Sequence, residues 1–295
     1  MKIEYKKTLL RKMFGKPLLP TINLSRKDIA VKARELAGKL SISGVQPKLS
    51  LALIKEELKP VTTKGQYILK PQTDMFENLP ENEYLCMSIA ESLGINVPPN
   101  ILIKLTDGSY AFLIKRFDRM PGNKKVQLED FSQILQKDKY SGSYEQIAKF
   151  MKDSPEINNL QIQYFFERVV YAFIIGNADA HLKNFSILTK DDISTISPAY
   201  DLVSSRLAIP EEKDELALSL CGKKSKLKRE HFITFGQTLS IPEKEVNAWL
   251  DKCIHFHETI RKLTLYSYLP DEKKTDFLEI IDNRLNGLNK NEYEH

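Results

Sequence analysis

GNADAHLKNF, residues 176–185, is the densest polar cluster in this sequence. It directly follows Tyr164–Ile175, a run that is hydrophobic nearly all round and therefore predicts a helix in the core. Apolar residues then resume, and the runs Phe185–Leu188 and Ile193–Ile196 predict two short strands. A buried helix that ends in Asn, Asp, His, Lys and Asn puts several polar side chains at the edge of a core, which is where chemistry is expected.

The spacing within and after this cluster indicates phosphoryl transfer. Asp179 and Asn184 are five positions apart, and Asp201 follows Asn184 by seventeen. Protein kinases use this D-x-x-x-x-N…D order, in which one Asp accepts the proton of the attacking hydroxyl while the Asn and the later Asp hold magnesium. Carboxylate and amide oxygens suit Mg²⁺, whereas zinc prefers His or Cys. A capped helix end followed by a polar turn would look similar, so the pattern needs support from the rest of the chain.

The N-terminal third predicts a small antiparallel sheet with one helix inserted between its strands. Asp107-Gly108 is a strong hairpin signal between two of the strands. Residues 1–22 are expected to be an extended lead-in, followed by a helix that Ser25 caps and Gly38 ends. The expected strands lie within Leu49–Ile54, Gln66–Lys70, Ile101–Leu105 and Tyr110–Arg116, and the inserted helix is Asn82–Leu93.

The character of the chain changes after Pro121-Gly122-Asn123, and Pro242–Leu288 predicts two or more amphipathic helices. We therefore divide the chain into residues 1–120 and 121–295. The predicted fold class is α+β, a bilobal protein-kinase-like fold with a small β-rich N-lobe and a larger helical C-lobe. A ligand is expected in the cleft between such lobes.

The predicted N-lobe carries three weaker signals that fit ATP. Lys70 ends a hydrophobic strand, and Glu83 in the next helix is the natural partner for the lysine–glutamate ion pair of kinases. A solvated strand end would explain Lys70 alone equally well. The loop 41–48 could cradle phosphates with its backbone amides and Lys48, although it has a single glycine. Residues 115–117 end the last strand at the lobe boundary, where backbone groups and the Phe117 ring could bind adenine.

Together these signals occur in the order that a kinase requires, so we predict a phosphotransferase that uses ATP and Mg²⁺. The composition agrees with an ordinary globular enzyme. Hydrophobic residues make up 42% of the chain and charged residues 28%, and the formal net charge is +5. The uncharged run 169–178 is only half as long as the roughly 20 residues of a membrane span. Three widely spaced cysteines and a charged N-terminus without a secretory signal predict a cytoplasmic protein without a membrane partner.

Six motifs stand out along the chain: Ser-Ile-Ser-Gly-Val-Gln-Pro-Lys (41–48), Ile-Leu-Lys-Pro (68–71), Asn82-Glu83, Lys-Arg-Phe-Asp-Arg (115–119), Asn-Ala-Asp-Ala-His-Leu-Lys-Asn-Phe-Ser (177–186) and Ser-Pro-Ala-Tyr-Asp-Leu (197–202). Together they resemble the HipA family, bacterial serine/threonine kinase toxins of toxin–antitoxin modules. The likeness spans roughly residues 8 to 290. Because the chain enters the kinase region almost at once, it resembles the short HipT-type kinases of HipBST modules, in which an N-terminal subdomain of HipA is a separate small protein.

The resemblance implies a role for each matching residue. Asp179 is expected to be the catalytic base, with His181 and Asn184 as its companions, and Asn184 and Asp201 are expected to bind magnesium. Ser41 and Ser43 correspond to autophosphorylation sites, where added phosphate would repel ATP from the loop. The residues expected to contact ATP are Ser43, Gly44, Val45, Gln46, Lys48, Lys70, Glu83, Lys115, Phe117, Tyr200 and Asp201.

The resemblance also implies partners. The protein substrate is expected to be an aminoacyl-tRNA synthetase, whose phosphorylation would inhibit translation and arrest growth. The expected regulators are a HipS-like small antitoxin and a HipB-like DNA-binding protein, through which the chain would associate indirectly with operator DNA. Two departures from the family limit the analogy: Leu202-Val203 follow Asp201 in place of the Phe-Gly of eukaryotic kinases, and Lys115 replaces an acidic hinge residue.

Two alternatives keep the fold and change the function. Asp179-x-His181 resembles the D-x-H-x-x-N loops of aminoglycoside and lipid kinases, so a small-molecule hydroxyl could be the acceptor. A catalytically silent ATP-binding regulator is the other alternative, although Asp179, Asn184 and Asp201 are all intact.

Overall fold

The computed structural model describes residues 3–36, 46–120 and 124–289. The chain folds as two compact units, the first of residues 1–84 and 98–125 and the second of residues 85–97 and 126–295. Helix α3 (Leu79–Leu93) contributes its first turns to unit 1 and the rest to unit 2. The sequence-based division at residue 120 remains a prediction about functional lobes.

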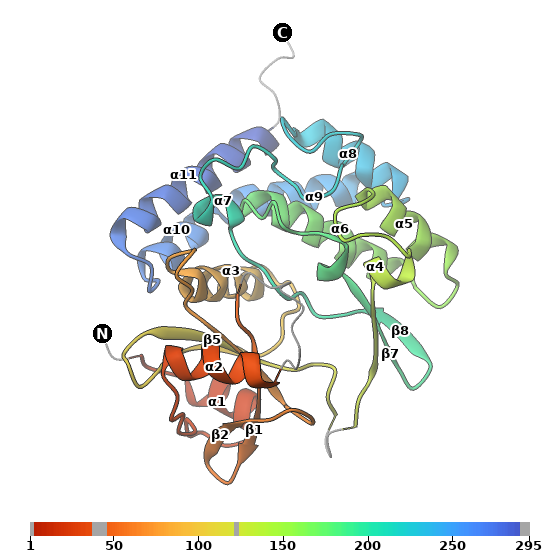
Figure 1. The fold of residues 1–295 in the computed structure, drawn as a ribbon. Coiled ribbons are helices and arrows are strands. Elements are labelled where there is room, and N and C mark those ends of the chain that lie inside the picture. Colours follow the sequence, from red (N-terminus) through yellow and green to blue (C-terminus); the bar gives the residue numbers. More distant parts are fainter. Residues whose placement is uncertain (1–2, 37–45, 121–123, 290–295) are drawn as a thin grey trace. The chain divides into compact units, whose positions relative to one another are not determined.

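Unit 1 is built on a five-stranded antiparallel sheet in the order β2-β1-β3-β5-β4. Figure 1 labels β1, β2 and β5 of this sheet. The predicted hairpin at Asp107-Gly108 is confirmed, because β4 and β5 pair on either side of it. Gly108 adopts a positive φ there, a conformation that favours glycine. The strands are β1 (Leu49–Ile54), β2 (Glu57–Pro60), β3 (Tyr67–Pro71), β4 (Asn100–Lys104) and β5 (Tyr110–Lys115).

Two helices precede this sheet. The prediction of an extended lead-in was wrong, because Lys7–Phe14 forms helix α1. Its buried side chains are Leu10, Met13 and Phe14, and the Phe14 ring centroid lies 5.5 Å from that of Tyr67 on β3. A helix places these apolar residues on one face against the sheet, which an extended segment cannot do. Helix α2 (Arg26–Leu36) was predicted, and Ser25 and Asp28 exchange hydrogen bonds at its start.

Unit 2 is mainly helical and packs around α6 (Asn159–Ile174), the helix predicted from residue 164. The helix begins earlier because the Asn158 side chain caps it by accepting from the Gln161 N–H. Nearly every side chain beyond its first two turns is buried, including aromatic rings that pack on Phe235. The other helices are α4 (Phe131–Ile134), α5 (Tyr144–Asp153), α7 (Ser205–Ala208), α8 (Arg229–Thr238), α9 (Glu243–His255), α10 (His257–Leu265) and α11 (Asp271–Leu288).

A small sheet in unit 2 has the order β6-β7-β8. Strands β7 (Ser186–Lys190) and β8 (Ile193–Ile196) confirm the predicted pair. The sequence did not indicate β6 (Gln127–Asp130), whose side chains alternate between exposed and half-buried without an apolar run. The polar cluster 176–185 therefore joins a core helix to this sheet, as its sequence predicts.

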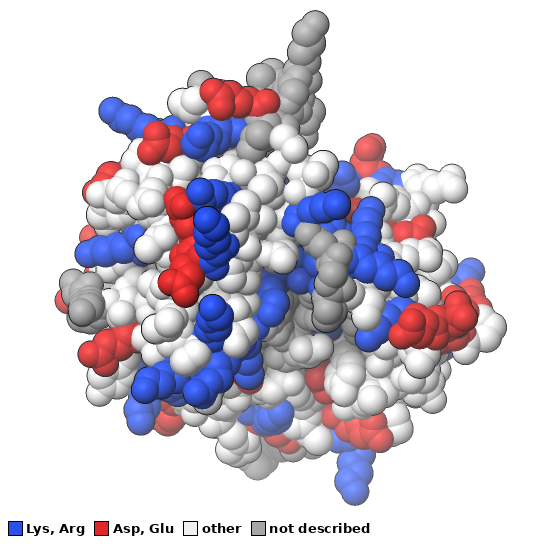
Figure 2. All heavy atoms as spheres, turned by 90° about the horizontal axis from the view of Figure 1, so that it is seen from below, with Lys and Arg blue, Asp and Glu red and all other residues white. Residues whose placement is uncertain are grey.

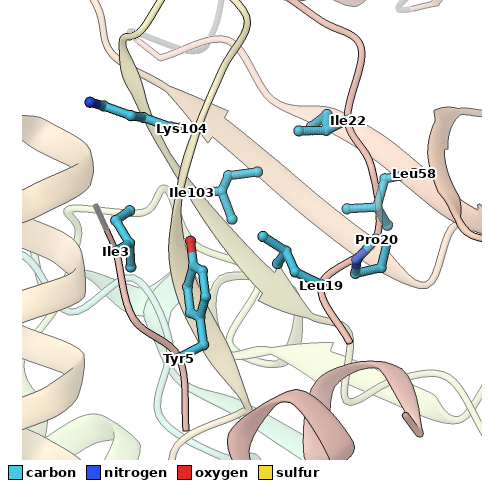
Figure 3. A pocket seen from close by; sticks show the side chains of 8 residues that line it. All are labelled: Ile3, Tyr5, Leu19, Pro20, Ile22, Leu58, Ile103 and Lys104. Carbon is cyan, nitrogen blue, oxygen red and sulfur yellow. The ribbon is translucent and has the colours of Figure 1, made fainter. Parts of the chain in front are cut away.

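The surface of the described chain adds two observations. Lys and Arg side chains gather toward the lower left of the face drawn in Figure 2. In unit 1 an apolar pocket of about 510 Å³ is lined by Ile3, Tyr5, Leu19, Pro20, Ile22, Leu58, Ile103 and Lys104 (Figure 3), which include no predicted site residue. Within the ranges that the structure describes, no helix combines the length and hydropathy needed to cross a bilayer.

Candidate active site

Unit 1 holds the predicted lysine–glutamate pair. The Lys70 ammonium on β3 donates to Oε1 of Glu83 on α3 over 2.6 Å, and the two side chains are only 6% and 3% exposed. Lys70 Nζ also lies 5.7 Å from the ring centroid of Phe112, its cross-strand neighbour on β5. The lysine is therefore a buried, paired charge, and the solvated strand end that the sequence left open is excluded.

The segment before β1 is only partly described. Ser41, Ser43, Gly44 and Val45 lie outside the described residues. Gln46 donates from Nε2 to the carbonyl of Pro71, over 2.9 Å, so the end of this loop is tied to the end of β3 beside Lys70. Lys48 is exposed immediately before β1.

The predicted adenine-binding segment follows β5. The Lys115 ammonium donates to the Lys12 carbonyl over 2.8 Å, in the last turn of α1, and its backbone N–H donates to the Pro99 carbonyl. Burial lowers the pKa of Lys115 below its ordinary value. Phe117 is half-buried two residues further on. Lys115 thus caps a helix, and of this segment Phe117 remains the side chain best suited to contact a base.

An ion cluster fixes the chain just beyond Phe117. Arg116 makes two hydrogen bonds to the Asp118 carboxylate, at 2.9 and 2.6 Å, and Arg119 adds a third at 2.9 Å. Burial alone would raise the pKa of Asp118, but the two guanidinium groups outweigh it and lower the pKa. Both arginines belong to the motif Lys-Arg-Phe-Asp-Arg, so their role here is to hold the backbone around Phe117.

In unit 2 a glycine turn begins the candidate catalytic loop. Gly176 has a positive φ, and an added Cβ would lie 2.9 Å from Ile280 and 3.1 Å from Arg206. Asn177 is buried, and its side chain accepts from the Asp179 N–H at 3.1 Å and donates to the Asp201 carbonyl at 3.4 Å. One buried amide therefore connects the backbones of the two predicted aspartates.

Asp179 and His181 occupy different environments on this loop. Asp179 is exposed at the surface of unit 2. His181 is buried, and its Nδ1 has no hydrogen-bond partner among the described residues. Burial lowers the pKa of His181, although the nearby Asp179 charge acts in the opposite direction. The neutral imidazole is therefore favoured, and the carboxylate is the group placed to accept a proton from outside.

The two predicted metal ligands lie together. Asn184 Nδ2 is 3.4 Å from Oδ2 of Asp201, and the side-chain oxygen of Asn184 accepts from the His181 N–H. Among the described residues no group of three His, Cys, Asp or Glu could hold a metal. Mg²⁺ is commonly bound by one or two protein oxygens together with phosphates and water, so this pair fits a magnesium ion that a nucleotide completes.

Tyr200 braces the same region. Its hydroxyl lies 2.5 Å from Ser186 Oγ on β7 and donates to the Lys183 carbonyl at 2.8 Å, so it links the candidate loop to the sheet just before Asp201. Burial raises the pKa of this phenol well above its ordinary value, and it stays protonated at neutral pH. The sequence assigned Tyr200 to ATP, and its described contacts are structural ones.

Sequence reasoning missed two tyrosines that contact the loop. The Tyr140 hydroxyl donates to Asp179 Oδ1 at 2.6 Å, and the buried Tyr144 hydroxyl donates to the Ala180 carbonyl at 2.8 Å. Tyr140 lies just ahead of α5 and Tyr144 is its first residue, so both are far from the loop in the sequence. The only signal in the sequence was a tyrosine, Tyr140, in a turn-rich segment, and its distance from Asp179 along the chain matches no known motif.

A known protein family matches most of this chain. The sequence profile of the HipA-like C-terminal domain matches residues 40–260, which include every predicted catalytic and metal-binding residue. The chain belongs to the HipA-like C-terminal domain family. A putative kinase of Haemophilus influenzae is 32% identical in an alignment 302 residues long, and the match covers 92% of this chain and 88% of that protein. The serine/threonine-protein kinase toxin HipA of Shewanella oneidensis is 29% identical over 192 residues, covering 56% of this chain and 43% of that one.

Two solved structures share the fold. HipA of Shewanella oneidensis, in a complex with HipB and operator DNA, matches with a TM-score of 0.68 and 22% identity over 84% of this chain and 64% of HipA. The kinase CtkA of Helicobacter pylori matches with a TM-score of 0.59 and 16% identity over 85% of this chain and 92% of CtkA. The α+β, bilobal kinase-like fold class predicted from the sequence is thus confirmed.

Proposed function

We propose that this chain is an ATP- and Mg²⁺-dependent serine/threonine protein kinase that acts as the toxin of a bacterial toxin–antitoxin module. The observation that carries the proposal lies in unit 2. An exposed Asp179 shares one loop with Asn184, and Asn177 and Tyr200 brace this loop. Asp201, which follows β8, adjoins Asn184. This is the set of groups that phosphoryl transfer to a hydroxyl requires of a protein.

Each residue then has a role. Asp179 accepts the proton of the acceptor hydroxyl, since its carboxylate is exposed while its backbone N–H is fixed by Asn177. Asn184 and Asp201 would hold Mg²⁺, which neutralises charge on the ATP phosphates when bound. Lys70, fixed by Glu83, would contact phosphate, and Gln46, Lys48 and Phe117 would contact the nucleotide. His181 supports the loop as a buried neutral side chain.

The biological role rests on the family and on the names of the relatives. A relative is named a serine/threonine-protein kinase toxin, and HipA of Shewanella oneidensis has been solved with HipB and operator DNA. We infer a cytoplasmic toxin of the short HipT type whose protein substrate is an aminoacyl-tRNA synthetase. Its partners would be a HipS-like antitoxin and a HipB-like DNA-binding protein, with indirect association to operator DNA.

We further propose that Ser41 and Ser43, which lie outside the described residues, are autophosphorylation sites that switch the enzyme off. Two phosphates would add about −3 to −4 of charge next to the site of an anionic nucleotide. The test is the intact mass of the purified protein after incubation with Mg·ATP, beside Asp179→Asn and a Ser41→Ala/Ser43→Ala double variant. We expect a gain of one or two phosphates that is absent in both variants.

Other outcomes separate the alternatives. A gain that survives in the double variant keeps the kinase and contradicts the loop switch. Phosphate found on an added aminoglycoside, with none on protein, would favour the small-molecule phosphotransferase. ATP binding by a dephosphorylated protein that transfers phosphate to no acceptor would favour the silent regulator.

A further inference from the structure

The Tyr140 phenol is hydrogen-bonded to the exposed carboxylate of Asp179, which we assign as the base. Its hydroxyl donates to Asp179 Oδ1 over 2.6 Å, in the segment between α4 and α5. A carboxylate can only accept hydrogen bonds, so the phenol keeps its proton in this contact. Burial, together with the hydrogen bond to Asp179, raises the pKa of Tyr140 above its ordinary value, which keeps the phenol protonated at neutral pH.

Three further contacts hold the phenol in this place. The Tyr140 ring meets the His181 ring edge-on, with centroids 5.1 Å apart and an interplanar angle of 72°. Such an arrangement is favourable for two aromatic rings. The Lys139 ammonium lies 4.5 Å from the Tyr140 ring centroid, and the Lys139 carbonyl accepts from the Leu182 N–H at 3.0 Å. The segment is therefore docked on the candidate catalytic loop through both backbone and side chains.

The contact nevertheless lies at the surface of unit 2. Tyr140 is 47% exposed and Asp179 is exposed as well. The phenol can leave Asp179 by a change of side-chain rotamer, with no opening of the core. By contrast, the neighbouring Tyr144 is fully buried and its hydroxyl is held by the Ala180 carbonyl, so it has no such freedom.

The distance has a direct chemical meaning. A general base has to lie about 2.6–3.2 Å from the hydroxyl whose proton it accepts. The phenol oxygen of Tyr140 lies within this distance of the Asp179 carboxylate. Among the described residues, Tyr140 is the one whose side chain hydrogen-bonds that carboxylate. We infer that Tyr140 occupies the position of the acceptor hydroxyl and competes with the acceptor for Asp179. The inference rests on the proposed role of Asp179 as the base.

This competition would make the free enzyme slow. Water and unselected hydroxyls would meet a base that is already occupied, and only an acceptor that binds well enough to displace the phenol would be phosphorylated. Tyr140 would therefore suppress wasteful ATP hydrolysis and increase the affinity that an acceptor needs in order to be phosphorylated. A merely structural tyrosine predicts the opposite response to its removal, because loss of a support lowers the rate.

Hydrolysis of ATP, with water as the acceptor, tests the inference without knowledge of the protein substrate. We would measure phosphate release from Mg·ATP by the full chain and by Tyr140→Phe, which removes the hydroxyl and keeps the ring on His181. The matched control is Tyr164→Phe, an exposed tyrosine on α6 that makes no hydrogen bond to Asp179. Thermal unfolding of each variant verifies that the fold is retained.

We expect Tyr140→Phe to hydrolyse ATP about tenfold faster, the size of one hydrogen bond to a charged group, with an unchanged KM for ATP. Tyr164→Phe should match the wild type, and adding Asp179→Asn should abolish the gain. A rate in Tyr140→Phe that is unchanged or lower would overturn the role of Tyr140 alone. No hydrolysis and no phosphate transfer by any form, despite ATP binding, would remove the proposed kinase function and this inference with it.

Discussion

The charged candidate-site residues of the two units differ in their exposure and in their hydrogen-bond partners. In unit 1, Lys70 and Glu83 form a buried ion pair, 6% and 3% exposed, that is complete without a ligand. In unit 2, Asp179 is exposed and hydrogen-bonds a neutral phenol. A buried pair is costly to break and keeps a cation in one place, whereas an exposed carboxylate can be substituted at little cost to folding. The difference predicts that stability and activity respond separately to substitutions in the two units.

The largest effect is expected from Asp179→Asn. The amide is similar in size and cannot accept the proton, so phosphate transfer should fall by about 10²- to 10⁴-fold. The free energy of unfolding should stay within about 0.5 kcal/mol of the wild type, because the side chain is exposed. Radiolabelled phosphate transfer and urea unfolding measure the two quantities. A large loss of stability would show that the Asp179 carboxylate has a structural role, as the buried pair of unit 1 has.

Lys70→Met, unlike Asp179→Asn, should lower the free energy of unfolding substantially. It leaves the Glu83 carboxylate buried without its cation, which should cost about 3–5 kcal/mol of unfolding free energy. The double variant Lys70→Met/Glu83→Leu removes both charges and should recover most of that loss while phosphate transfer stays impaired. Chemical denaturation measures the stabilities. Equal stabilities for the wild type and Lys70→Met would mean that the pair is open to solvent.

A smaller and more selective effect is expected from Asp201→Asn. Asp201 has a positive φ, a left-handed conformation that Asn tolerates, so the fold should be retained. Loss of the negative charge beside Asn184 should raise the magnesium concentration for half-maximal transfer by about tenfold or more. The measurement is a magnesium titration of transfer at fixed ATP, with Asp192→Asn as the control because Asp192 also has a positive φ and lies in the exposed β7–β8 turn.

The smallest effect concerns Glu81, near the start of α3 in unit 1. Burial raises its pKa above the ordinary value of 4.5, although a hydrogen bond with Asn78 partly opposes this, and Oε2 has no partner in the described chain. The folded state therefore holds a proton that the unfolded state has released, and stability falls as the pH rises from 4.5 through the raised pKa. Glu81→Gln removes this dependence.

Glu81→Gln should accordingly be more stable than the wild type by about 1 kcal/mol at pH 7, and the gain should vanish toward pH 4. Unfolding free energies measured over this range test the sign. A gain that grows on acidification would show that the carboxylate is stabilised in its charged form, and would contradict the assignment of Glu81 as a burial cost.

The sequence predicted those parts of the fold whose signals are local. The Asp107-Gly108 turn, the Ser25 cap and the apolar run of α6 each depend on neighbouring residues, and all appear in the structure. Helix α1 was not predicted because its apolar face is short and is recognisable only from its packing on Tyr67 of β3. Strand β6 was not predicted because it has no apolar pattern of its own. Its pairing with β7 alone defines it as a strand.

The same distinction applies to the candidate site. Although their roles stay predictions, Asp179, Asn184 and Asp201 could be identified as candidates because their order and spacing match those of protein kinases. The structure brings Asn184 and Asp201 together. Tyr140 could not, since 39 positions separate it from Asp179 and tertiary packing alone creates the contact. The sequence placed the Lys115 segment at the nucleotide through its backbone groups and Phe117. It did not predict that the Lys115 ammonium donates to a carbonyl of α1, because that helix was itself not predicted.

The role of Asp179 is tested by comparing ATP binding and phosphate transfer in one variant. Purified Asp179→Asn and wild-type protein would be titrated with Mg·ATP by calorimetry and then assayed for radiolabelled phosphate transfer to protein. We predict equal ATP affinity and transfer in the wild type alone, because the carboxylate acts on the acceptor and the nucleotide is held by other residues. Transfer by Asp179→Asn at the wild-type rate would contradict the assignment of Asp179 as the catalytic base.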